Sequence, residues 1–121
     1  MNIEELREYC LHKKGVTEEF PFDEFTLCFK ISGKIFVLTD IESRPLSFNV
    51  KCDPEKAVWL RDTYTSVQPG YHMNKKHWNT IIADGSASKS LLQEWIDDSY
   101  HLVVASLPKA QRQALAENTL H

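Results

Sequence analysis

The spacing of apolar residues near the start of the chain predicts a helix. Ile3, Leu6 and Cys10 recur at helical intervals after Asn2, a residue type that caps helices. Glu5 occupies the third helical position, as in a capping box. The pattern stops at a glycine, so we predict a first helix over residues 3–14.

The next segment, residues 16–22, has neither a helical nor a strand period. It reads V-T-E-E-F-P-F, and Pro21 prevents a continuing helix. We therefore expect a linker, with Phe20 and Phe22 anchoring it against the core.

From Phe25 the period changes to two, which is typical of strands with one buried face. Residues 25–32 place Phe25, Leu27, Phe29 and Ile31 on the apolar face. A Ser-Gly turn then separates this strand from a second one over residues 34–39, which predicts a hairpin. Residues 46–52 alternate in the same way, so we expect a third antiparallel strand with one face in water.

The second half of the chain alternates between helical and extended patterns. Asp53-Pro54 is a cap followed by proline at the first helical position, which predicts a short helix ending near Tyr64. Extended structure is expected at residues 66–68 and again at 78–83. An apolar stripe, which includes Trp95 and Ser99, then predicts a long helix ending near residue 107.

These elements define an α+β fold of two layers, with an antiparallel sheet and helices packed on one face. The predicted order is α-ββ-β-α-ββ-α, without an internal repeat. We expect one domain over residues 1–107, because 121 residues leave no room for a second core. Residues 108–121 are expected to form a short helix or a loosely ordered tail.

The composition indicates a cytoplasmic, monomeric protein without a membrane segment. No apolar run reaches the length of about 20 residues that spans a bilayer, and the N-terminus lacks the layout of a signal peptide. Cys10, Cys28 and Cys52 lie far apart within apolar patterns, so we expect them to be buried and reduced.

The candidate functional surface is the segment 69–79, P-G-Y-H-M-N-K-K-H-W-N, which we call the 69–79 loop. The net charge is −3, yet the stretch from Thr63 to Ala83 contains two lysines and two histidines but no acid. Lysines can neutralise phosphates, asparagines offer paired donors and acceptors, and Tyr71 or Trp78 can stack on a base. The alternative is structural: the aromatic residues belong to the core, His72 and Asn74 satisfy loop backbone groups, and the lysines are only solvated.

Metal binding and catalysis have weaker support in the sequence. His72 and His77 are five residues apart, which is not the spacing of one helical face, and no acid lies nearby to complete a metal site. The chain has no phosphate-binding glycine loop and no nucleophile elbow. We therefore expect a non-enzymatic protein that requires no metal or cofactor.

Several motifs resemble those of the MmcQ/YjbR family. They are T-E-E-F-P-F at 17–22, S-G-K-I-F at 32–36, S-F-N-V-K-C-D-P at 47–54, P-G-Y-H-M-N-K-K-H-W-N-T at 69–80 and S-Y-H-L-V-V-A-S-L-P at 99–108. The resemblance covers residues 3–108. It implies a frataxin-like, double-wing fold, with one wing at residues 25–40 and the other at 67–83, and it implies binding to DNA.

The predicted function is therefore DNA binding through phosphate contacts. The predicted binding residues are His72, Asn74, Lys75, Lys76, His77, Trp78 and Asn79, with Lys34 and Arg44 as auxiliary contacts. Two other functions stay open. The same surface could bind a small anionic ligand or a protein partner, with Trp78 as the floor of a pocket. The acidic first helix could instead bind cations, as in a frataxin-like protein.

Overall fold

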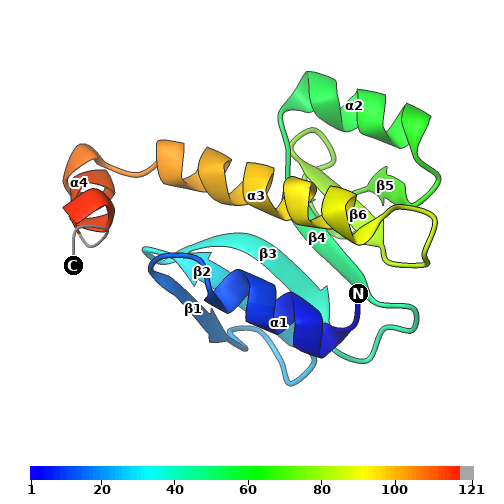
Figure 1. Cartoon of the computed structure of the whole chain (residues 1–121), viewed down its shortest axis with the longest axis horizontal. Helices are drawn as coiled ribbons and strands as arrows, with labels where there is room; N and C mark the ends of the chain where they lie inside the picture. The colour runs from blue at the N-terminus through cyan, green and yellow to red at the C-terminus, as the bar shows by residue number, and fades with distance from the viewer. Residues whose placement is uncertain (118–121) are drawn as a thin grey trace.

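The computed structural model describes residues 1–117 and contains a six-stranded antiparallel sheet (Figure 1). Across the sheet the strand order is β1-β2-β3-β4-β6-β5. The strands are β1 Val16–Glu19, β2 Thr26–Ile31, β3 Lys34–Asp40, β4 Ser47–Lys51, β5 Val67–Pro69 and β6 Trp78–Ile82. The predicted α+β class with an antiparallel sheet is confirmed.

The linker prediction for residues 16–22 was wrong in its first half. Residues Val16–Glu19 form β1, an edge strand in which Val16 pairs with Ile31 and Glu19 with Cys28. Four residues are too few to show a strand period. The pairing with β2 supplies the backbone hydrogen bonds that favour the extended form.

The β2–β3 hairpin forms as predicted. Ser32 and Gly33 both have positive φ angles, 50° and 80°. Positive φ at both central residues is the geometry of a type I′ turn, whose twist matches that of the two strands it joins.

In the described part of the chain, four helices accompany the sheet: α1 Ile3–Leu11, α2 Pro54–Thr63, α3 Lys89–Ala105 and α4 Lys109–Glu117. The Asn2–Glu5 capping box and the Asp53 cap are present as predicted. Helix α1 ends three residues earlier than expected, at Leu11, because the chain turns before Gly15 to enter β1. Helix α4 lies beyond the C-terminal end of α3 in Figure 1.

The helices cover one face of the sheet and leave the other, which we call the open face, to two loops. Alternate strand residues such as Leu27, Phe29 and Ile81 join Leu6 and Ile96 in one buried core. The intervening positions form a row across five strands on the open face: Cys28, Leu38, Asn49, Thr80 and Gln68. The two loops that border this face are residues 20–25 and the 69–79 loop.

The expected anchoring of the 16–22 linker by Phe20 and Phe22 was wrong, and so was the placement of Phe25 on a buried strand face. Phe20, Phe22 and Phe25 are 47%, 69% and 46% exposed. Phe25 precedes β2 rather than continuing its buried face, and Pro21 lies in a bend. The loop therefore presents aromatic side chains to solvent, which is unusual when three lie so close together.

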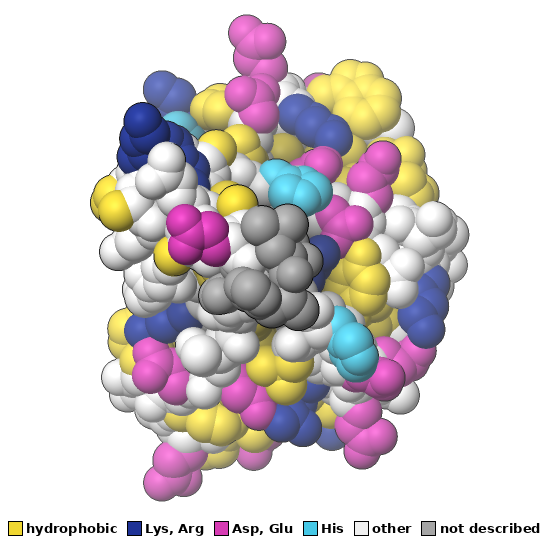
Figure 2. Space-filling view, turned by 60° about the vertical axis from the view of Figure 1, so that its left-hand side comes forward, with side chains coloured by type: hydrophobic (Ala, Val, Ile, Leu, Met, Phe, Trp, Pro, Cys, Tyr) yellow, Lys and Arg dark blue, Asp and Glu magenta, His cyan; other side chains and the backbone are white. Residues whose placement is uncertain are grey.

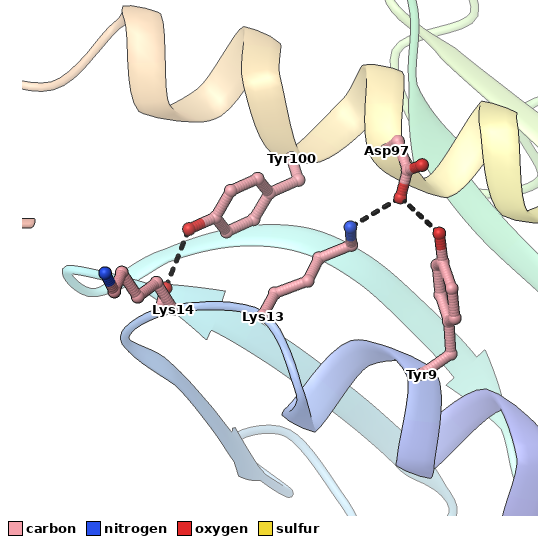
Figure 3. A network of polar contacts seen from close by, with 5 residues as sticks. All are labelled: Tyr9, Lys13, Lys14, Asp97 and Tyr100. Carbon is pink, nitrogen blue, oxygen red and sulfur yellow. Dashed lines mark hydrogen bonds and ion pairs between the residues drawn. The ribbon is translucent and has the colours of Figure 1, made fainter. Parts of the chain in front are cut away.

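A polar network fixes α1 and its following turn to α3 (Figure 3). Asp97 Oδ1 accepts hydrogen bonds from the Tyr9 hydroxyl at 2.7 Å and from Lys13 Nζ at 2.5 Å. The Tyr100 hydroxyl donates to the Lys14 carbonyl at 2.8 Å. Lys13 Nζ also lies 4.9 Å and 5.2 Å from the ring centroids of Tyr9 and Tyr100, within cation–π range. These contacts hold the helical layer together at its centre.

Within the described part of the chain, none of the helices has the length and apolar character needed to cross a membrane. Cys10, Cys28 and Cys52 are buried free thiols, as predicted. Burial raises the pKa of Cys10 to about 12 and that of Cys52 to about 11, so both stay protonated at neutral pH.

Candidate functional site

The 69–79 loop connects β5 to β6 and is tied together by its own backbone. Gly70 N donates to the Trp78 carbonyl at 3.0 Å, and Met73 N donates to the Gly70 carbonyl at 3.3 Å. The His77 carbonyl accepts from Cys52 N at 2.8 Å, which joins the loop to the end of β4. A loop with this many internal bonds presents its side chains in defined positions.

Two of the predicted binding residues have structural contacts inside the loop. The side-chain oxygen of Asn74 accepts a hydrogen bond from Lys76 N at 2.9 Å. The backbone carbonyl of Asn74 accepts hydrogen bonds from His77 N and Trp78 N. Lys75 Nζ donates to the Gly70 carbonyl at 3.0 Å. For Asn74 this is the structural alternative described above, in which its side chain satisfies loop backbone groups.

Three further predicted residues are withdrawn from solvent to different degrees. Asn79 is fully buried on the helical side of β6, where Nδ2 donates to the Ala57 carbonyl of α2 at 3.4 Å. Trp78 and His77 are half-buried, and Trp78 pairs with Lys51 of β4. Trp78 is not among the residues that line the cleft described below.

Lys34 and Arg44 are not brought to the loop. Lys34 begins β3, and its Nζ lies 3.5 Å from the carbonyl and from the hydroxyl of Ser106 at the end of α3. Arg44 follows the other end of β3 and donates to the carbonyls of Ile41 and Ser43. The nine predicted residues therefore form no single surface. The exposed basic side chains of the loop are His72, Lys75 and Lys76.

The loop instead forms one wall of a cleft of about 430 Å³ on the open face, which we call the open-face cleft. The 20–25 loop forms the opposite wall, and strands β2, β3 and β4 provide the floor. The lining residues are Phe22, Asp23, Thr26, Leu38, Thr39, Asp40, Asn49, Tyr71, His72 and Met73. Of these only His72 belongs to the predicted binding residues.

A chain of hydrogen bonds fixes the floor to the wall. Tyr71 N donates to Thr80 Oγ1 at 2.9 Å, and Thr80 Oγ1 contacts Asn49 Oδ1 at 2.5 Å. The Thr80 hydroxyl accepts from the Tyr71 N–H and donates its own proton to the Asn49 side-chain oxygen. With its oxygen bonded to Thr80, Asn49 has an amide nitrogen that no described residue engages, and Asn49 lines the cleft.

Two carboxylates lie at the end of the cleft where β2 begins and β3 ends. Asp23 Oδ1 accepts from Phe25 N at 2.8 Å and from Thr26 N at 2.7 Å, and these bonds lower the pKa of the carboxyl. Asp40 is the cross-strand partner of Thr26, and its Oδ1 accepts from Glu42 N at 2.8 Å. Both acids therefore flank Thr26.

The cleft walls carry exposed aromatic rings. Phe22 and Tyr71 are each 69% exposed, and the Tyr71 ring lies 4.0 Å from the His72 ring, centroid to centroid. His72 has a positive φ of 57°, which turns the chain at this point. Sequence reasoning missed Asp23, Asp40 and Asn49, because three separate segments bring them together. The wet face predicted for residues 46–52 was the only available signal for Asn49.

Metal binding and cation binding were the other candidate chemistries. Among residues 1–117, no three His, Cys, Asp or Glu side chains are grouped as metal ligands. Glu5 of the acidic first helix is paired with Lys89 at 2.7 Å, and Glu18 of β1 is paired with Arg7. Both pairs lie at the surface, with the two glutamates half-buried, and each pair lowers the pKa of its carboxyl.

Comparison with known proteins identifies relatives over almost the whole chain. A family model described as YjbR matches residues 11–102. Uncharacterized protein YbdF of Escherichia coli O157:H7 is 43% identical over 110 residues, covering 83% of this chain and 88% of the relative. Uncharacterized protein YjbR of Escherichia coli strain K12 is 34% identical over 118 residues, covering 97% of this chain and 99% of the relative.

Two solved structures share the fold. Deinococcus radiodurans protein DR2400, described as a DUF419 domain, has a TM-score of 0.90 at 40% identity, over 95% of this chain and 88% of that chain. A Pseudomonas syringae protein has a TM-score of 0.73 at 26% identity, over 84% of this chain and 98% of that chain. The comparisons therefore establish the family and the fold. The names of these proteins state no ligand and no reaction, so the function has to be argued from the site.

Proposed function

The chain belongs to the YjbR family, and from the site described above we propose that it is a binding protein whose ligand occupies the open-face cleft. The observation that carries this proposal is the construction of the cleft. A hydrogen-bonded floor presents a free amide at Asn49, and two walls present exposed aromatic rings at Phe22 and Tyr71. Concave sites with apolar walls and a few fixed polar groups are typical of ligand binding.

The cleft is prepared for a ligand before any ligand arrives. Thr80 fixes Tyr71 to the sheet, and Gly70 and Met73 are bonded within the loop. Little ordering of the wall is therefore required on binding, which favours affinity.

NMR titration of the ¹⁵N-labelled protein with a mixed library of neutral, cationic and anionic fragments tests this proposal. We expect binders to shift the amide signals of Thr26, Leu38, Asn49 and Tyr71. Tyr71→Ala should weaken binding, whereas Trp59→Ala, which removes an aromatic ring that is 56% exposed on α2, should leave it unchanged. Binders that shift only the residues around the pocket of Cys52, His101 and Leu102 would refute the proposal.

DNA binding is a second candidate, supported by the exposed cations of the 69–79 loop. Lys76 is exposed, and no described residue pairs with its ammonium group. Lys75 and His72 are also exposed, although Lys75 is bonded to the Gly70 carbonyl. So few cations would neutralise only two or three phosphates, which predicts weak binding with a shallow salt dependence. Figure 2 brings forward the side of the molecule on which α4 lies, and on that face basic and acidic side chains are interspersed.

Fluorescence anisotropy with labelled duplex DNA at low salt separates this candidate from the first. Lys75→Glu with Lys76→Glu should abolish DNA binding, whereas Lys14→Glu with Lys109→Glu changes the net charge equally elsewhere and should weaken it less. Equal losses in the two double variants would show that only the net charge matters. DNA binding by the loop would then be excluded.

A further inference from the structure

The charged side chains that line the open-face cleft indicate which class of ligand it accepts. An inference about that ligand rests on the proposed function, in which the cleft is the binding site. Asp23 and Asp40 both flank Thr26 and both line the cleft. His72 is the one basic side chain among the described residues of the lining. An anion in this cleft would therefore face two carboxylates, and a cation would be attracted by them.

Asp40 is the carboxylate that can still accept hydrogen bonds from a ligand. Its Oδ1 accepts from Glu42 N, and none of the described residues donates to its Oδ2. Asp23 is more fully engaged, since Oδ1 accepts two backbone N–H groups and Oδ2 lies 3.2 Å from the Thr26 hydroxyl. A bound cation would thus make its direct contact with Asp40, while Asp23 adds negative potential.

The aromatic walls are an independent reason to expect a cation. Phe22 and Tyr71 are each 69% exposed on opposite sides of the cleft, where neither ring is needed for the core. The face of an aromatic ring attracts a cation, and a planar guanidinium group can stack on it while forming two parallel bonds to a carboxylate. A phosphate would gain nothing from these rings.

The size and the floor of the cleft describe the rest of the ligand. A volume of about 430 Å³ exceeds what a guanidinium group alone would fill. Leu38 and Met73 offer apolar contact, and the Asn49 amide nitrogen offers a hydrogen-bond donor to a carbonyl. We infer that the open-face cleft binds a guanidinium compound of the arginine type, with its cationic group at Asp40 between the aromatic walls and a carbonyl group at Asn49.

Matched pairs of ligands test this inference through the charge alone. The probes are L-arginine amide and L-citrulline amide, which have nearly the same shape but differ in the positive charge of the side chain. A second pair, acetyl-Gly-Arg-Gly-amide and its citrulline counterpart, distinguishes a free small molecule from the side chain of a peptide. NMR titration of the full chain gives both the binding site and the dissociation constant.

Asp40→Asn is the decisive variant. Asparagine keeps an oxygen for the bond to Glu42 N, so the turn is preserved while the charge is removed. We expect about a fivefold loss of affinity for the arginine ligands, as for an exposed ion pair. Asp84→Asn is the control, because Asp84 is also exposed and accepts from the backbone N–H two residues later. If Asp40→Asn fails to fold, Phe22→Ala tests the wall instead and should also weaken binding.

Each outcome decides the question. Arginine-dependent shifts at Thr26, Asn49 and Tyr71 that are lost in Asp40→Asn would establish the inference. Equal binding of the citrulline ligands would overturn it while leaving the cleft as the binding site. Absence of binding by all four ligands, when neutral fragments still shift the cleft residues, would also overturn the inference but not the proposed function. Absence of every binder at the cleft would overturn both.

Discussion

The Thr80 hydroxyl joins the 69–79 loop, one wall of the open-face cleft, to Asn49 in its floor. It accepts from Tyr71 N at 2.9 Å and contacts Asn49 Oδ1 at 2.5 Å. Thr80→Val removes the hydroxyl and keeps the shape and the strand preference of the side chain. The change therefore isolates the two hydrogen bonds.

The expected loss of stability follows from these bonds. A neutral hydrogen bond contributes about 0.5–1.5 kcal/mol to folding, so two bonds give an upper range of about 1–3 kcal/mol. Thr80 is 9% exposed and Tyr71 is at the surface, so water can replace part of the lost bonding. We expect Thr80→Val to lower the free energy of unfolding by about 1–2 kcal/mol.

Urea denaturation measures this free energy, and hydrogen exchange locates its origin. Exchange of the Tyr71 amide should become at least about tenfold faster, because its acceptor is lost. Thr17→Val is the control: Thr17 is exposed on β1, and its hydroxyl has no partner among the described residues. Unchanged exchange at Tyr71 would refute the view that Thr80 holds the loop to the sheet.

Three further predictions concern the fold around the site. Ser99 is fully buried, and its hydroxyl contacts Lys51 N at 2.8 Å and the Phe36 carbonyl at 2.5 Å. Ser99→Ala removes both contacts and should lower the free energy of unfolding, measured by urea denaturation, by about 2–4 kcal/mol. A loss as small as that caused by the exposed Ser90→Ala would contradict this. Gly70→Ala should displace the 69–79 loop, because the new Cβ would lie 2.9 Å from both Trp78 Cβ and the Trp78 carbonyl oxygen. The NMR signals of the loop measure this displacement, and changes no larger than those in Lys76→Ala would exclude it. Burial and the hydrogen bond to Asp97 raise the pKa of the Tyr9 hydroxyl from 10.0 to about 12. The stability that this shift contributes is present below pH 10 and should be lost as the pH rises toward 12, which thermal melts of wild type and Tyr9→Phe can measure. Parallel losses in the two proteins would disprove this.

Local rules explain which parts of the fold could be predicted from the sequence. Asn2 with Glu5 and Asp53 with Pro54 predicted helix starts, and the Ser-Gly turn predicted the first hairpin. In each case the interacting groups lie within a few residues of one another, so the sequence alone contains the interaction. The buried cysteines followed from periodicity for the same reason.

Only the tertiary structure decided the composition of the site. Residues 16–19 became a strand because β2 lies beside them, and Phe22 became exposed because the chain bends away from the core at Pro21. Asp23, Asp40 and Asn49 are neighbours because strand pairing aligns β2, β3 and β4, and Thr80 turns the 69–79 loop toward them. The sequence located the loop, since its unusual side chains are contiguous. What that loop faces depends on strand register and on which side of the sheet the helices cover, and both are set by contacts between residues far apart in the chain.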